Sequence, residues 1–358
     1  MSDTNMRQYR TDIRWQLLTT VSAIALIASA CGMGETRAAD SDRPLLWIEL
    51  NGQLAQQETG QNAYLPPFAL VSSFDGVSRA GIEKASPTIW DKGAKVTFQP
   101  IESDWVLSLA LRYGKTARTE STSQLTTHPY TSHYGNHFYS ANQIFKAQSS
   151  ESHVIMDFRV GKDVGLGMFG GGGSSIFSAG VRIAQFDARD DIAMKSQPTN
   201  VKRGSPHNIF YGSFAANRRF NGIGPSLSWD ASANVVGVPN DGGISLDWGV
   251  NGAVLFGRQK VSGQQRTAEN NVHTQSSARL IRYSVYQHSP SPDRSRQATV
   301  PNLGGFAGVS WRYPNAKVSA GYRADFFFGA MDGGIDARKN ENVGFHGPFA
   351  SVSVGIGG

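Results

Sequence analysis

Apolar and polar residues alternate with period two along most of the chain after residue 40. In residues 105–113, for example, Trp105, Leu107 and Leu109 alternate with Ser108 and Ala110. Such alternation predicts a β-strand with one apolar and one polar face, and no segment of this region has the period of an amphipathic helix. The pattern predicts ten strands, in residues 46–54, 94–99, 105–113, 154–160, 179–183, 214–235, 244–256, 307–313, 318–328 and 350–356.

The connections between these strands are alternately short and long. The short or glycine-rich ones are residues 100–104, 162–174, 237–243 and 314–316. The long ones are polar and cover residues 57–92, 117–151, 188–213, 263–299 and 331–342. Membrane barrels have short periplasmic turns and long outer loops, whereas a soluble sandwich gives no reason for this alternation.

Aromatic residues and the strand count favour the same architecture. Trp105 and Trp311 lie close to the short-turn ends of their strands, whereas Tyr113 and Phe256 lie at the opposite ends of theirs. Aromatic residues at the two membrane interfaces form two such girdles. Membrane strands must close into a barrel because lipid offers no partner for a free edge. We therefore predict an all-β protein: an antiparallel up-and-down transmembrane β-barrel of about ten strands (8–12), with long outer loops and short periplasmic turns.

The N-terminal residues have the order of a secretory signal peptide. Basic residues precede an apolar core at Val21–Ala28, and Thr36-Arg37-Ala38 follows as a small-x-small cleavage site. We expect residues 1–38 to be cleaved and residues 39–358 to form a single outer-membrane barrel. A retained anchor and a lipidated Cys31 are the alternatives, although Ala28 stands where a lipoprotein signal has Leu.

Composition excludes several classes of protein. The chain of 358 residues has 17% charged residues and a formal net charge of +6, with no basic cluster that would indicate nucleic-acid binding. A single cysteine excludes an internal disulfide framework and a cysteine-based zinc site. A mean hydropathy of −0.32 excludes a helical membrane bundle.

Charged residues in the polar phase of the strands are the best functional candidates. The predicted lumen-facing residues, with Glu49 as a further carboxylate, are Lys95, Arg112, Asp157, Arg159, Arg182, Asp230, Asp247, Arg312, Arg323 and Asp325. These six cations and five carboxylates either line a narrow aqueous path or form a salt-bridged plug. Six against five predicts little or only weak preference for anions. The first interpretation is a small porin-like protein that passes small solutes or ions. The alternative is a closed barrel that acts as a structural or surface-interaction protein through its outer loops.

Three patterns suggest other chemistry but have weak support. Gly165–Gly170 matches the G-x-G-x-x-G dinucleotide fingerprint, yet the following segment alternates as a strand and supplies no helix N-terminus. His128, His133 and His137 could bind a metal, but Pro129 and Gly135 interrupt the segment. His153 and Asp157 lack a marked nucleophile. We expect no enzymatic activity, no cofactor and no metal.

Four short motifs resemble the strands of a known family. They are Gly180–Phe186, Phe220–Pro225, Gly321–Phe326 and His346–Phe349. Their succession resembles the Legionella major outer membrane protein-like family over about residues 45–358. The resemblance implies a pore-forming barrel in the outer membrane of a Gram-negative cell. The expected partners are the lipids and lipopolysaccharide of that membrane, the machinery that inserts barrels and, for a pore, small solutes; nucleic acid is not expected.

Overall fold

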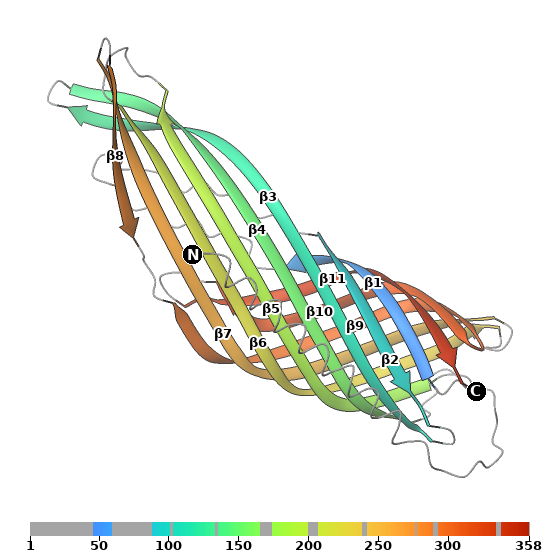
Figure 1. The fold of residues 1–358 in the computed structure, drawn as a ribbon. Helices are drawn as coiled ribbons and strands as arrows, with labels where there is room; N and C mark the ends of the chain where they lie inside the picture. Colours follow the sequence, from blue (N-terminus) through green and yellow to red (C-terminus); the bar gives the residue numbers. More distant parts are fainter. Residues whose placement is uncertain are drawn as a thin grey trace. The chain divides into compact units, whose positions relative to one another are not determined.

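The computed structural model contains eleven β-strands, shown in Figure 1. It describes residues 46–58, 88–100, 103–132, 135–164, 174–199, 207–237, 242–275, 278–288, 293–333 and 338–357. The strands are β1 (Leu46–Glu58), β2 (Thr88–Phe98), β3 (Trp105–Ser132), β4 (Gly135–Asp163), β5 (Ser174–Pro198), β6 (His207–Val236), β7 (Gly243–Gln275), β8 (Ala278–His288), β9 (Arg294–Tyr313), β10 (Ala316–Asp332) and β11 (Asn340–Ile356). The predicted signal peptide, residues 1–38 with Cys31, lies outside the described residues.

Ten of these strands close into an antiparallel barrel. Each strand from β1 to β7 pairs with the next, β7 continues to β9, β10 and β11, and β11 returns to β1 in the register Leu46↔Ile356. Strand β8 pairs only with the distal part of β7, from Gln265↔His288 to Gln275↔Ala278. The predicted ten-strand barrel is confirmed. No helix in the described part of the chain is long and apolar enough to span a bilayer.

The two ends of the barrel differ. The connections β2–β3, β4–β5, β6–β7 and β9–β10 lie at one end, which we call the short-turn end. At the other end, the extended end, β3 and β4 remain paired as far as Ser132↔Gly135, and β5, β6 and β7 also run on (Figure 1). Most of residues 117–151, 188–213 and 263–299 is therefore strand, where the sequence predicted long loops. Paired backbone satisfies its own hydrogen bonds in water as well as in lipid, so the strands need not end at the membrane edge.

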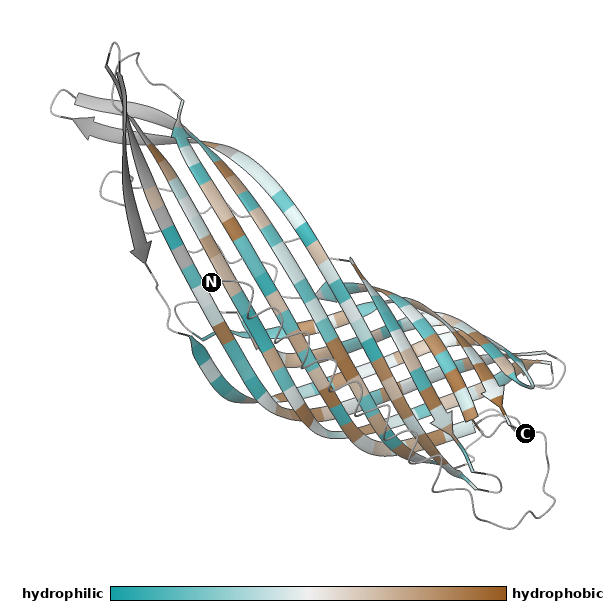
Figure 2. Cartoon of the chain, viewed as in Figure 1, coloured by the Kyte–Doolittle hydropathy of each residue, from teal (hydrophilic) through white to brown (hydrophobic). Residues whose placement is uncertain are grey.

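Alternation along the strands places apolar side chains on the outer surface of the barrel. Leu50, Val250 and Leu227 are 64%, 52% and 67% exposed, and brown and teal positions alternate along the strands in Figure 2. On β5 this apolar surface ends at Ile183, and the next outward residues are Gln185 and Asp187. The outward apolar band is the surface that a bilayer would cover, and we call it the apolar belt.

Candidate functional site

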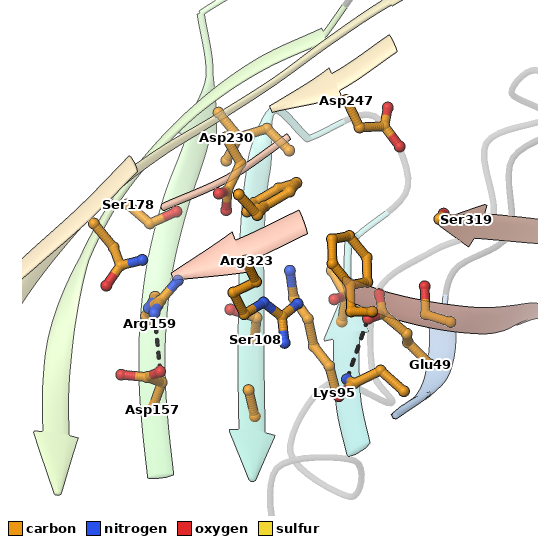
Figure 3. Close-up of a pocket in the computed structure, with 18 of the residues that line it drawn as sticks. Glu49, Lys95, Ser108, Asp157, Arg159, Ser178, Asp230, Asp247, Ser319 and Arg323 are labelled. Carbon is orange, nitrogen blue, oxygen red and sulfur yellow. Dashed lines mark hydrogen bonds and ion pairs between the residues drawn. The ribbon is translucent and has the colours of Figure 1, made fainter. Parts of the chain in front are cut away.

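A cavity of about 270 Å³ occupies the barrel interior near the short-turn end. All ten ring strands contribute to its wall, which includes residues at strand ends such as Ser174 and Lys317. The ten lumen candidates from the sequence all line it, as does Glu49: Lys95, Arg112, Asp157, Arg159, Arg182, Asp230, Asp247, Arg312, Arg323 and Asp325. Figure 3 shows that Lys95, Arg159, Asp230 and Arg323 point into this space from different strands. Alternation along each strand is the reason that residues so far apart in sequence meet here.

Arg182 lines the end of the cavity that faces the extended end of the barrel. Its guanidinium is 1% exposed and donates two hydrogen bonds to the Asp157 carboxylate, of 2.7 and 3.0 Å. It also donates to Asn251 Oδ1 at 2.8 Å and to Asn302 Oδ1. Arg159 lies on the other side of the same carboxylate, with Nη2 at 2.9 Å from Oδ2. One carboxylate thus serves two guanidinium groups, and this group of three carries a net positive charge.

A second group of three lies nearer the short-turn end. Asp247 accepts a hydrogen bond of 3.1 Å from Arg312 and forms an ion pair of 2.6 Å with Lys317 Nζ. Arg312 also donates to Ser232 Oγ at 2.7 Å. Lys317 was not among the residues predicted from the sequence, although it shares the phase of Ser319 and Arg323 on the same strand. Lys317 lies next to the tight β9–β10 turn, one residue before Val318, where the alternating apolar pattern begins. The pattern therefore gave no direction for the Lys317 side chain.

The remaining charges leave the cavity with a small positive excess. Arg112 forms a 2.7 Å ion pair with Asp325, whereas the Arg323 guanidinium lies over the Phe349 ring, 4.8 Å from its centroid. With Lys317 included, the wall carries seven Lys and Arg against five Asp and Glu. The predicted near balance of six against five is therefore shifted toward the cations.

An apolar layer lies in the lumen next to Arg182, on the side toward the extended end. Inward side chains from nine of the ring strands meet there, and we call this layer the seal. Its members are Ala55, Ile89, Ile155, Ala184, Phe186, Ala188, Phe220, Ala253, Leu255, Val300, Phe327, Ala330, Met331, Val343 and Phe345. Phe327 is 0% and Phe345 1% exposed, and the Phe186 ring lies 4.8 Å from Phe327, centroid to centroid, in an edge arrangement. A small space of about 10 Å³ lies beside Phe186 and Phe345, which is at the lower limit for one water molecule.

Polar groups resume beyond the seal toward the extended end. His153 lies with Nε2 at 3.1 Å from Asp91 Oδ1, and both side chains are buried against the seal beside Phe345. Farther out, Arg218 donates to Asp190 and to Glu341, each at 2.6 Å. Burial alone would lower the pKa of the Arg218 guanidinium, but these two carboxylates and Glu151 outweigh burial, so the pKa is raised. Sequence analysis missed this cluster because Asp190, Glu341 and Glu151 lie in segments predicted as loops, although Arg218 lies in a predicted strand.

The other candidates from the sequence are not part of this site. Gly165–Gly170 and His133 lie outside the described residues, and the side chains of His128 and His137 are not described. Among the side chains that the structure describes, no group of three or more His, Cys, Asp or Glu residues has the geometry of a metal site. His153 and Asp157 both face inward, but Arg182 and Arg159 occupy the Asp157 carboxylate.

Comparisons with known proteins give one family assignment. No curated protein matches the chain. A bacterial polysaccharide outer membrane secretin is a similar solved structure, with 9% identity, 88% of this chain and 99% of that chain covered, and a TM-score of 0.20. The profile of the Legionella pneumophila major outer membrane protein precursor matches residues 91–356. This match spans most of the barrel strands described above. The chain therefore belongs to the Legionella major outer membrane protein family, a family of outer-membrane proteins.

Proposed function

We propose that this protein is a closed outer-membrane barrel, with a lumen that does not conduct in the form described here. The observation that supports the proposal is the seal, in which fifteen buried apolar side chains pack into one cluster beside the charged cavity. Ions cross an apolar constriction only when water fills it, and a constriction packed with phenylalanine rings excludes water. A barrel of ten strands is only slightly wider than the eight-strand type that side chains can fill.

A closed barrel acts through the surfaces that it presents. The strands β3 to β7 continue beyond the apolar belt and carry polar residues outward, among them Arg189 and Asp191. We infer that this extension is the functional surface outside the cell and that the barrel anchors it. Pulldown of surface ligands is a secondary test, because the absence of conduction must be established first.

A gated pore is the second candidate, and the charged cavity favours it. A structural plug would need charges that neutralise one another, but the wall has an excess of two cations. In this candidate the seal is the gate, and an opened lumen would prefer anions over cations. The porin-like passage of small solutes would then require movement of Phe327 or Phe345.

Conductance in a planar bilayer distinguishes the two functions. We expect the refolded protein to give no steady current, and Phe327→Ala with Phe345→Ala to introduce a leak because two rings leave the seal. Phe256→Ala with Phe328→Ala is the matched control, since these rings are 56% and 44% exposed on the outer surface, and it should remain silent. A steady current through the unaltered protein, with anion preference, would refute the closed barrel and support the pore.

A further inference from the structure

Five cations lie on the outer surface of the barrel where the apolar belt ends at the extended end. We call them the basic collar: Lys92 on β2, Lys115 on β3, Arg219 on β6, and Arg258 and Lys260 on β7. Four of them are exposed and Arg219 is partly exposed. Their outward direction follows from their neighbours, because Ile89 and Gln259, in the opposite phase of the same strands, are 0% and 1% exposed.

Aromatic residues mark the depth of the collar. Trp90 is directly opposite Lys115, and Tyr113 is directly opposite Lys92, on the paired strands β2 and β3. Both rings are outward, with 55% and 45% exposure. Amphipathic rings of this kind take the level of lipid headgroups in membrane barrels. The collar cations therefore lie at the level of lipid phosphates rather than of acyl chains or open water.

Like charges meet within the collar. Arg219 is directly opposite Lys260, and Arg258 lies on the same face two residues before Lys260. Directly opposite side chains have Cβ atoms about 5 Å apart, and like charges in this arrangement destabilise a sheet. Asp187 accepts a hydrogen bond from Arg219, and it is the only outward carboxylate at this edge among the described side chains. The pair Arg258 and Lys260 has no carboxylate partner in the described part of the chain, so an external anion would relieve the repulsion.

We propose that the basic collar binds the phosphate groups of anionic lipid headgroups in the leaflet at the extended end. Arg and Lys on neighbouring strands can hold one phosphate from two sides, the guanidinium through paired hydrogen bonds and the ammonium through its charge. The opposite edge of the belt has no comparable group among the described residues: its outward cation is Lys162, whose cross-strand partner Trp105 directly follows Asp104. This asymmetry fits a membrane whose outer leaflet carries the phosphorylated glycolipid. The proposal does not depend on whether the lumen conducts.

Lipid titration of the purified full-length protein tests the proposal. The probe is lipid A with two phosphates, added to the protein in neutral detergent, and native mass spectrometry counts the bound lipid. Each cation near an anionic lipid surface contributes about 1 kcal/mol, so Arg258→Gln with Lys260→Gln should weaken binding about 10- to 30-fold. Lys92→Gln with Lys115→Gln should weaken it similarly. Lys146→Gln with Lys162→Gln removes the same charge from exposed positions outside the collar and should leave binding unchanged.

Two further arms identify what the collar recognises. Lipid A without phosphates should bind at least tenfold more weakly than the phosphorylated form, and millimolar inorganic phosphate should not displace the lipid. Equal binding of both forms of lipid A, or equal loss in the Lys146 and Lys162 control, would overturn the phosphate site. Displacement by inorganic phosphate would overturn the assignment to lipid. All these variants lie at exposed positions, and thermal unfolding in detergent verifies that they fold.

Discussion

Replacement of Arg182 by Met tests the group of Arg182, Asp157 and Arg159, which lies between the charged cavity and the seal. The change removes both hydrogen bonds to Asp157 and those to Asn251 and Asn302. Asp157 keeps Arg159 at 2.9 Å and is not left as an unpaired charge. Two asparagine oxygens lose their donor, one on the buried Asn302 and one on the half-buried Asn251. An unsatisfied buried acceptor costs about 1–3 kcal/mol, so Arg182→Met should cost about 2–4 kcal/mol.

Removal of the carboxylate instead should cost more. In Asp157→Asn the guanidinium of Arg182 stays charged and buried without its anion, which costs about 3–5 kcal/mol. The double variant should cost less than the sum of the two by at least about 1 kcal/mol, since the two side chains contact each other. Equilibrium unfolding in lipid vesicles measures all three. Arg189→Met, which breaks an exposed pair with Asp191, is the control and should cost under about 1 kcal/mol. A cost under about 1 kcal/mol for Arg182→Met, or additive costs in the double variant, would refute the reasoning.

The remaining predictions concern the outer surface, the cluster beyond the seal and the leader. Val250→Arg and Ala320→Arg place a charge on the apolar belt and should each cost about 2–4 kcal/mol in vesicle unfolding, whereas a negligible cost at both would mean the faces are reversed. Arg218→Met should leave Asp190 and Glu341 without their shared cation in a largely buried site and should cost about 3–5 kcal/mol in vesicle unfolding, and a cost under about 1 kcal/mol would contradict the cluster. N-terminal sequencing of protein from outer-membrane fractions should begin near Ala39, and a retained Met1 or a lipidated Cys31 would contradict the predicted cleavage.

Period-two alternation was sufficient to predict the strands and the direction of their charged residues. Arg182 on β5, Arg312 on β9 and Asp157 on β4 each follow an outward apolar residue, and the pleat alone turns them inward. Strand ends were harder to predict. Thr119 and Gln148, for instance, are cross-strand partners in a segment predicted as a loop, because polar residues on both faces give no alternation once the strand leaves the membrane.

The seal was invisible to the same reasoning. Phe326, Phe327 and Phe328 form a continuous apolar run in which alternation identifies Phe326 and Phe328 as outward but says nothing about the inward Phe327. Ile155 lies between His153 and Asp157 in the inward phase of β4, so alternation alone groups it with polar residues. The sequence signal for an apolar layer in the lumen is an apolar residue in the polar phase of a strand. Several strands must carry such a residue at the same depth before it predicts a layer. Depth cannot be compared between strands without their register.

Cysteine accessibility from each side of the membrane tests the closed lumen most directly. In a chain with Cys31→Ser, Ser108→Cys would place a thiol in the wall of the charged cavity, and Thr119→Cys an exposed thiol on the extension. The protein is reconstituted in vesicles with one orientation. Labelling of Thr119→Cys shows which side the extended end faces. A small membrane-impermeant thiol reagent is then added to one side or the other. The closed barrel predicts that the reagent reaches Ser108→Cys only from the short-turn end. Labelling at a similar rate from the extended end would contradict it.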